Sequence, residues 1–167
     1  EVNLDGVVQW EKTFGGEGSD IGRCVTSTDD GGYIVSGSSE SFPADEFQPD
    51  LYLIKTDANG NPAWEKTFGV GAMESGNAVM QTDDGGFIVA GTAALPGGSS
   101  VYLIRTSPSG DSLWTGRFGT GDFIEGRSIA IAPDGNYVIA GGVSGFDYSE
   151  DVCVLFVDPQ GRLIRQM

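Results

Sequence analysis

The hexapeptide WEKTFG occupies residues 10–15, and the same six residues recur unchanged at 64–69. A looser copy, WTGRFG, follows at 114–119, so the three copies are 54 and then 50 residues apart. Self-similarity at a nearly fixed period is the sequence signature of a repeat architecture. The chain is therefore expected to contain successive units of one kind.

A second motif keeps the same spacing. DDGGYIV at residues 29–35 becomes DDGGFIV at 83–89 and PDGNYVI at 133–139. Because two separate motifs recur in the same order and with the same steps, the sequence predicts three equivalent structural units.

Each unit reads as four β-strands. Short runs rich in Val, Ile, Tyr and Phe are bounded by Gly, Asp or Asn, and no helical period of 3.6 residues lies between them. Asp-Gly and Asn-Gly dipeptides between the first two and the last two strands supply the positive backbone torsion of a tight hairpin. Each unit is therefore expected to be an antiparallel meander, whose strands in the first unit are residues 21–28, 32–37, 51–57 and 62–68.

A four-stranded antiparallel sheet repeated about every 50 residues predicts a β-propeller, in which each blade packs on its neighbours. The expected fold class is all-β, with three propeller blades of 50–54 residues in this chain. A β-sandwich of about twelve strands is the alternative. It does not require the same Trp and the same turns in every unit.

The repeated residues carry a resemblance to a known family. DGGYIVSG at 30–37, YLIKT at 52–56, NGN at 59–61 and the WEKTFG motif together represent a pattern that covers nearly the whole chain. This pattern resembles the propeller repeats of secreted and surface proteins of archaea and bacteria, and more distantly the blades of quinoprotein-like propellers. The resemblance implies a scaffold whose function lies in loops that differ from protein to protein.

The two ends of the chain do not complete a blade. The third unit has Arg165 where the others have Trp, and its last strand is short. A propeller ring generally needs four or more blades, so we expect a longer chain or another copy of this chain to complete the ring. Residues 1–167 are thus expected to be one propeller segment, divided into an outer strand of a preceding or closing blade (1–15) and blades at 16–68, 69–118 and 119–167.

The charge balance limits the partners. Nine basic residues stand against 24 acidic ones, for a net charge of -15. Nucleic acids and anionic membranes are disfavoured, because polyphosphate binding relies on clustered Lys and Arg, and no apolar run approaches the roughly 20 residues that insert across a bilayer. The chain starts at Glu1, which fits either a removed signal peptide or an excised piece. With the resemblance, this predicts an extracellular or cell-surface protein.

The residue types for common catalytic centres are missing. The sequence contains no His, which excludes Ser-His and Cys-His relays and imidazole metal ligands. Cys24 and Cys153 lie in expected strands and are interpreted as buried, inert thiols, with a disulfide as the alternative. We therefore expect no catalytic residues and no cofactor other than calcium.

Calcium is considered first at the turn that contains Asp57, Asn59 and Asn61, because these side chains present alternating oxygens. The glycine is the fourth residue of this loop rather than the sixth, and no Glu follows at its far end. A structural turn is therefore favoured over a calcium loop. Hairpin turns are likewise favoured over acid-base catalysis for the carboxylate pairs at 29–30 and 83–84.

The recurring tryptophans have two interpretations. An aromatic side chain can stack on a sugar, but one that recurs at the same strand position is more naturally explained by packing between blades. We favour packing for Trp10, Trp64 and Trp114.

Topology predicts which surface binds. Strand direction alternates in a meander, so the links between units emerge on one face together with the variable links at 38–49, 92–100 and 143–150. Variable loops on a regular scaffold are a common binding surface. One equivalent position near the start of each innermost strand holds Arg23, Asn77 and Arg127. These side chains are expected either to connect neighbouring blades or to form a polar ring that contacts a ligand.

A calcium site, if present, is expected at the third variable link. Asp147, Glu150 and Asp151 are close in sequence there and would converge with Glu125 across the same face. A solvated acidic loop is the favoured alternative.

The leading functional prediction is a non-enzymatic extracellular or cell-surface module that binds a protein or glycan through its variable loops. A structural blade repeat of a surface layer or filament is one alternative. A fragment of a quinoprotein-like or hydrolytic propeller enzyme is the other, and it would need catalytic groups outside this chain.

Overall fold

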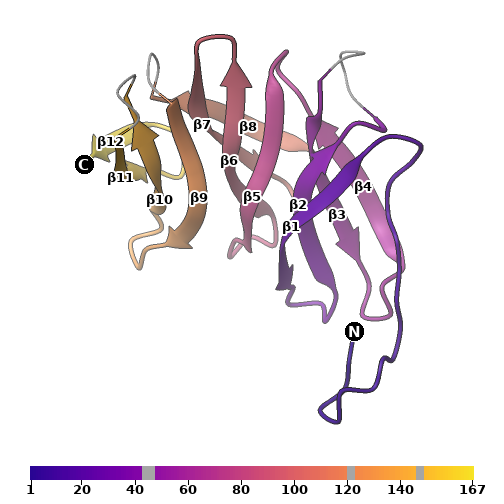
Figure 1. Cartoon of the computed structure of the whole chain (residues 1–167). Helices are drawn as coiled ribbons and strands as arrows, with labels where there is room; N and C mark the ends of the chain where they lie inside the picture. The colour runs from indigo at the N-terminus through magenta and orange to yellow at the C-terminus, as the bar shows by residue number, and fades with distance from the viewer. Residues whose placement is uncertain (43–47, 120–122, 146–148) are drawn as a thin grey trace.

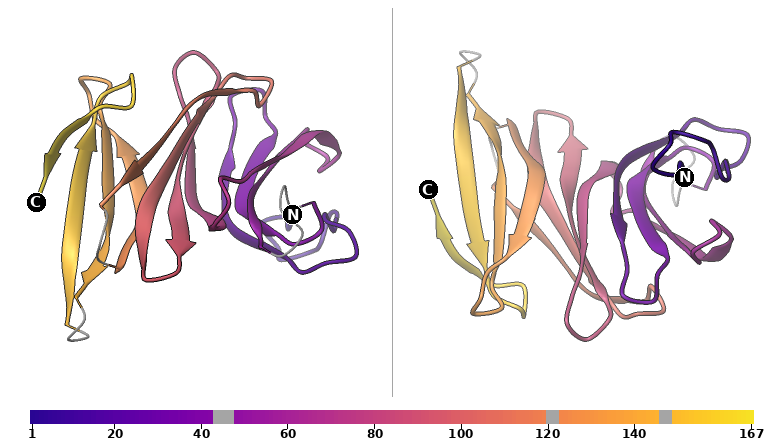
Figure 2. Two further views of the ribbon diagram at one scale, coloured as in Figure 1. Left: turned by 90° about the horizontal axis from the view of Figure 1, so that it is seen from above. Right: turned by 90° about the horizontal axis from the view of Figure 1, so that it is seen from below.

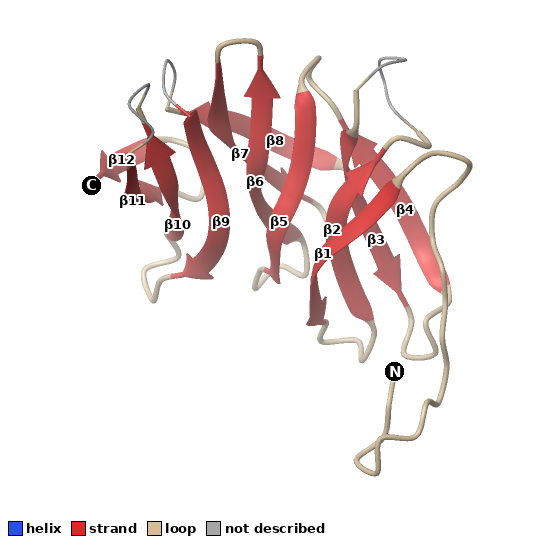
Figure 3. Ribbon diagram, viewed as in Figure 1, coloured by secondary structure: helices blue, strands red, loops and turns tan. Residues whose placement is uncertain are grey.

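The chain folds into β-strands connected by short links, in a computed structural model that describes residues 1–42, 48–119, 123–145 and 149–167 (Figures 1 and 3). The strands form three successive antiparallel meanders. The first comprises β1 (Asp20–Ser27), β2 (Tyr33–Ser39), β3 (Asp50–Thr56) and β4 (Pro62–Phe68). The second comprises β5 (Met73–Gln81), β6 (Phe87–Leu95), β7 (Gly98–Thr106) and β8 (Ser112–Phe118). The third comprises β9 (Phe123–Ile131), β10 (Tyr137–Ser144), β11 (Glu150–Val157) and β12 (Leu163–Gln166).

Hydrogen bonding makes two sheets from these strands. The first meander is a four-stranded antiparallel sheet by itself. The second and third are joined into a larger mixed sheet by a single parallel pair, Ser99 with Phe123. Figure 2 shows the three meanders lying side by side from above and below. The all-β class and the strand positions expected in the first unit are confirmed, with boundaries that differ by one or two residues.

The hairpin turns form as their sequences predict. In the first turn the amide of Gly31 donates to the carbonyl of Thr28 at 2.9 Å, and Gly31 has a φ of 82°. The turn between β3 and β4 repeats this arrangement with Asp57 and Gly60, whose φ is 75°. A residue with a side chain is strained at such torsions, which explains why glycine recurs there. The turns after the first and third strands lie at one end of the molecule, and the link between β6 and β7 lies at the other (Figure 1).

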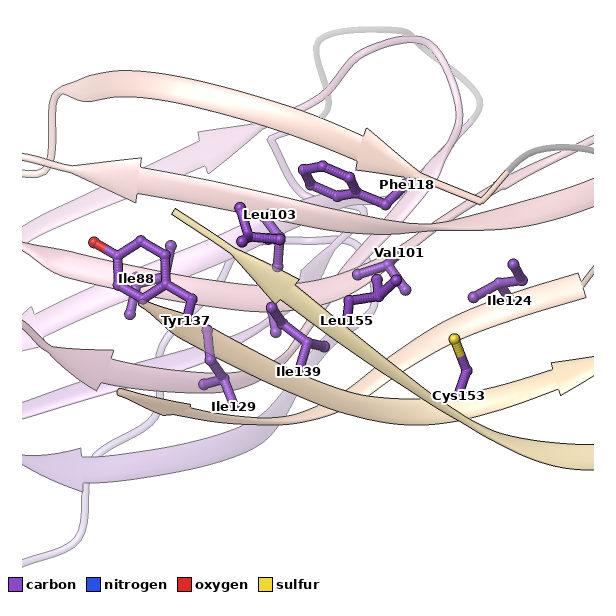
Figure 4. Close-up of a cluster of buried hydrophobic side chains, with 12 residues drawn as sticks. Ile88, Val101, Leu103, Phe118, Ile124, Ile129, Tyr137, Ile139, Cys153 and Leu155 are labelled. Atoms are coloured by element: carbon purple, nitrogen blue, oxygen red, sulfur yellow. The ribbon is translucent and has the colours of Figure 1, made fainter. Parts of the chain in front are cut away.

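The hydrophobic core lies between meanders rather than within one. One cluster joins β2 and β3, through Ile34, Leu51 and Leu53, to Val79 and Val89 of the second meander. A second cluster, drawn in Figure 4, joins the second meander to the third, and its members include Ile88, Val101, Leu103, Ile129, Tyr137, Ile139, Cys153 and Leu155. Each meander therefore depends on a neighbour to cover its apolar face.

The N-terminal arm, residues 1–15, differs from the expectation of a strand. It contains one isolated bridge, between Val2 and Val8, and the segment from Gln9 to Gly15 has no ladder. In the second meander the equivalent strand, β8, pairs with β7, whereas the described chain offers the arm no such neighbouring strand. The last strand of the third meander, β12, has four residues, whereas β4 and β8 have seven each.

In the part of the chain that the structure describes, no helix is long and apolar enough to cross a membrane.

Candidate functional site

A bulge interrupts the first strand of every meander at the same place. In β1 the register passes from Gly22 to Cys24, and in β5 from Gly76 to Ala78, so that Arg23 and Asn77 have no partner across the ladder. In β9 the same irregularity leaves out Arg127. A bulge bends the strand and redirects the extra side chain. The three sequence-predicted positions are therefore equivalent in structure as well as in sequence.

These three side chains line one hollow. It has a volume of about 500 Å³ and lies near the start of β1, β5 and β9, beside Ser38 and Pro49 at the two ends of the first variable link. The residues that line it come from all three meanders: Arg23, Ser38, Pro49, Met73, Glu74, Ser75, Asn77, Thr92, Ala94, Glu125 and Arg127. We call this the loop-face hollow. Sequence reasoning placed Arg23, Asn77 and Arg127 on one face, and the structure brings them to one site.

Asn77 connects two meanders. Its side-chain amide donates to the carbonyl of Gly126 in β9 at 2.7 Å and to the hydroxyl of Thr92 at 3.2 Å. Its Oδ1 accepts from the Ser75 hydroxyl at 3.2 Å. Asn77 therefore makes a hydrogen bond between neighbouring meanders, which is the kind of contact that one of the two sequence interpretations proposes.

Arg127 forms a cluster with two carboxylates. Its guanidinium lies 3.2 Å from Glu125 and 2.7 Å from Glu150. The hydrogen bonds that the guanidinium donates, first to Glu125 and then to Glu150, raise the pKa of Arg127 above its ordinary value. All three side chains are about half exposed, so the cluster is reachable from solvent.

Two of the four residues expected to bind calcium pair with Arg127 instead. Glu125 and Glu150 do converge, but on Arg127, which supplies the positive charge that a cation would otherwise provide. Asp151 follows Glu150 directly in β11, so its side chain points to the opposite face of the strand. Asp147 lies outside the described residues. Among the residues that the structure describes, no group of three or more acidic or cysteine side chains is positioned to hold a metal ion.

Arg23 differs from the other two. Its side chain is exposed at the hollow, and within the described ranges its guanidinium has no hydrogen-bond or ion-pair partner. An unpaired guanidinium presents a planar set of donors that suits carboxylates and other planar acceptors. Arg23 is therefore the group of the hollow that is most available to a ligand.

Glu74 is a member of the hollow that the sequence did not single out. It is buried, and its Oε1 accepts from the amides of Val70 and Ala72, both at 3.1 Å, which holds the link before β5. Its Oε2 has no hydrogen-bond partner in the described part of the chain. Burial raises the pKa of Glu74 to about 7, against these two hydrogen bonds. In the sequence Glu74 stands at the position equivalent to Asp20, which is a weak indication of a special role. The raised pKa comes from burial, which the sequence does not show.

The other carboxylate motifs are structural. Asp57 accepts from the amides of Asn59 and Asn61, both at 2.8 Å, and from the Asn61 side chain at 2.9 Å. These bonds, the Asn61 side chain first, lower the pKa of Asp57. Its oxygens are thus used in closing the turn, as the turn interpretation predicts.

The carboxylate pairs serve the hairpins. Asp30 accepts from the amide of Gly32 at 3.0 Å and binds the Lys55 ammonium at 2.8 Å. Asp84 makes the same contacts with Gly86 and Arg105. The hydrogen bond from Lys55 is the main cause that holds the pKa of Asp30 well below its ordinary value. The sequence did not reveal these ion pairs, because their partners lie on different strands.

The tryptophans pack between meanders, as predicted. Trp64 donates its indole N–H to the carbonyl of Pro108 at 3.2 Å, and its ring meets Phe87 of the second meander edge-on at 5.8 Å between centroids. Trp114 makes the equivalent contacts with Pro159 and Tyr137. Cys24 and Cys153 are both free, and burial raises the pKa of the Cys153 thiol.

Comparisons with known proteins address the fold alone. No protein-family model matches this sequence, and no curated protein matches it. Among solved structures, a protein of unknown function from Bacteroides caccae is similar, with a TM-score of 0.57 and 16% sequence identity over 99% of this chain and 67% of that chain. Identity this low says nothing of activity.

Proposed function

We propose that the three meanders are blades of a β-propeller, and that the chain is a non-enzymatic extracellular or cell-surface module that binds a protein or glycan through its loop face. One observation carries the binding proposal. The equivalent bulges of three inner strands place Arg23, Asn77 and Arg127 around one hollow beside the variable links.

The radial arrangement is supported by how the repeats meet. Every junction uses equivalent parts: an apolar core between faces, a Trp that lies on the aromatic residue of the next meander, and adjacent innermost strands. Repetition of one rotation per unit is what generates a propeller. On this proposal further blades of the same type complete the ring, either from a longer chain or from another copy.

The chemistry of the hollow suits a polar ligand. Its volume of about 500 Å³ is in the range of small-ligand sites, roughly 300–1,000 Å³. Ser38, Ser75 and Thr92 contribute hydroxyls, and Met73 contributes an apolar surface. With the Arg23 guanidinium, this lining favours a ligand that carries hydroxyl and carboxylate groups, such as a sugar or an acidic side chain of a partner protein.

Two other functions make different demands. A structural repeat of a surface layer or filament would place its contacts on the flanks of the array and not in the hollow. A propeller enzyme would need catalytic groups from blades outside this chain. Neither accounts for an unpaired Arg at the hollow.

The test replaces one guanidinium. Arg23→Ala is expected to reduce binding at least tenfold for any glycan or protein that the intact chain captures on an array, because a charge-assisted contact contributes about 1.5–3 kcal/mol. Arg162→Ala is the matched control, since Arg162 is also exposed but lies in the turn after β11, at the opposite end of the molecule.

Equal affinities of the two variants for a captured ligand would exclude the hollow as the site. Failure of the intact assembly to bind any glycan or protein on the arrays would contradict the function itself.

A further inference from the structure

The first meander exposes an apolar position that the other two bury. Val25 in β1 is 63% exposed, whereas its equivalents Val79 in β5 and Ile129 in β9 are 3% and 9% exposed. Val79 is buried because the first meander covers it, and Ile129 because the second meander does. The face of β1 that carries Val25 therefore corresponds to the face that the preceding meander covers in the second and third meanders, and here it is uncovered.

The third meander shows the complementary difference. Val152 in β11 is 77% exposed, whereas its equivalents Leu51 and Val101 are 0% and 1% exposed. Leu51 packs into the second meander, and Val101 into the third. The outer face of the third meander therefore carries the apolar group that the following repeat normally covers.

A groove on the first meander marks where such a group fits. It has a volume of about 170 Å³ and includes Phe14, Val35, Tyr52 and Ile54 in its lining. In the second meander the equivalents of the last three, Val89, Tyr102 and Ile104, belong to the core cluster that receives Leu51 and Leu53. The side chains that match Leu51 and Leu53 in the third meander are Val152 and Val154, so the free face and the free groove are both apolar.

The tryptophan contacts point to the same junction. Trp10 of the N-terminal arm lies on Tyr33 at 6.0 Å between ring centroids and on Gly60, as Trp64 lies on Phe87 and Gly110. The first meander thus already carries the Trp that a preceding repeat supplies. The third meander has Arg165 at this position, and its guanidinium lies 4.2 Å from the Phe156 ring centroid. One end supplies the Trp that the other end lacks.

We propose that a second copy of this chain docks the Val152 face of its third meander onto the Val25 face of the first meander. The contact is head-to-tail and joins two different surfaces. Its apolar part matches the interface that already exists twice within the chain, whereas the Trp position is filled by Trp10 of the receiving copy and not by the docking copy. The inference rests on the proposed radial arrangement of the blades but not on any ligand of the loop-face hollow.

The charge of the chain sets the conditions for this association. Each copy has a net charge of -15, so two copies repel at low ionic strength. Salt screens this repulsion, with a Debye length of about 8 Å at 0.15 M, and it leaves burial of apolar side chains intact. Association through the flanks is therefore expected to strengthen as salt is added.

The test uses two surface variants of the chain of residues 1–167. Light scattering after size exclusion should give the wild type a mass of at least twice the 17.5 kDa monomer at 0.15 M salt. Val25→Asp and Val152→Asp should each be monomeric alone, because each lacks one half of the contact. Mixed in equal amounts, they should form a 1:1 dimer, because the intact third meander of one meets the intact first meander of the other.

Leu113→Asp is the matched control. Leu113 in β8 is 58% exposed although the third meander follows the second, so it lies outside the contact between meanders and its variant should associate like the wild type. Circular dichroism establishes that each variant is folded. A monomeric wild type would overturn the proposal, as would a monomeric mixture of the two folded variants. Association of Val152→Asp alone would indicate a symmetric contact between first meanders and would also overturn it. None of these results depends on ligand binding, so they are separate from the test of Arg23.

Discussion

Each bulge that directs a side chain into the loop-face hollow depends on the glycine opposite it. A Cβ on Gly91 in β6 would lie 1.8 Å from the carbonyl oxygen of Ser75 in β5, and the equivalents Gly37 and Gly141 face the same obstruction. The obstruction exists because the bulged strand brings its backbone over the neighbouring strand. These glycines thus serve the site through backbone packing.

Gly91→Ala is expected to lower the free energy of unfolding by about 2–4 kcal/mol, because β5 must shift away from the new methyl group. Gly22→Ala is the control, since its Cβ would meet nothing closer than Val35 Cγ1 at 3.7 Å, and its change should stay within about 1 kcal/mol. Urea unfolding followed by tryptophan fluorescence measures both. Similar losses for the two variants would contradict the backbone obstruction.

Glu74 makes the stability of the protein depend on pH. Burial raises its pKa to about 7 in the folded protein, from an ordinary 4.5. The charge of Asp50 adds to this shift, and the charge of Arg117 opposes it. Between these values the folded state binds more protons than the unfolded state, so this contribution to stability is full below 4.5 and is lost as the pH rises through about 7.

Glu74→Gln should remove that decline. We expect the free energy of unfolding of the wild type to fall between pH 4.5 and pH 8 more steeply than that of the variant, because Gln keeps the oxygen that accepts from Val70 and Ala72 but does not ionise. Glu17→Gln changes an exposed carboxyl and should keep the wild-type slope. Parallel profiles for all three proteins would show that Glu74 does not titrate differently on folding.

At the scale of elements, a cation on the third strand of the first and second meanders forms an ion pair with the first hairpin turn. Lys55 reaches Asp30, and Arg105 reaches Asp84, although both cations are buried. A Cβ on Gly86 would lie 2.3 Å from Arg105 Nη1, so the glycine leaves room for the cation. The third meander has Phe156 in place of the cation and Asn136 in place of the glycine, and its Asp134 accepts from Asn136 instead.

Asp84→Asn is expected to lower the free energy of unfolding by about 1–2 kcal/mol, because the buried Arg105 loses its counter-charge. This figure is reduced because the carboxylate of Asp84 is exposed to solvent. Asp83→Asn, at the neighbouring position, removes the same charge without this contact and should have little effect. The hydrogen bond from Thr82 is the main cause that lowers the pKa of Asp84 to about 2, from 3.8. The difference between the variants should therefore persist above pH 3.8 and vanish as the pH falls through about 2, which acid titration of urea midpoints would reveal.

At the scale of the whole molecule, stability belongs to the junctions between meanders. The second meander contributes to both core clusters, whereas the first and third each contribute to one. In such an array each unit is stabilised by its neighbours, so the unit with two neighbours is the most stable.

Amide hydrogen exchange should follow this order. In Val25→Asp, which removes the proposed self-association, we expect the slowest exchange in β6 and β7 and faster exchange in β1 and β12, which have one uncovered side. Mass spectrometry of peptides from each meander measures the difference. Uniform protection across the three meanders would contradict a stability set by the junctions.

Much of this molecule follows from the sequence because its information is local and repeated three times. The turns, the four strands of each unit and the packing of Trp64 and Trp114 are predictable from glycine positions, hydrophobic alternation and a fixed period. The equivalence of Arg23, Asn77 and Arg127 also follows, since counting along equivalent units locates equivalent positions.

Other features depended on the tertiary structure, because they arise between segments far apart in the chain. No local pattern distinguishes Glu74 from an exposed Glu, and its raised pKa comes from burial that distant strands create. The capture of Glu125 and Glu150 by Arg127 depends on the pairing that places β9 and β11 on either side of β10. The arm at residues 7–15 has the sequence of a strand but no ladder, because a strand forms when a partner lies beside it. Local sequence determines which segments are able to pair and turn, whereas proximity in three dimensions decides which charges, faces and edges meet.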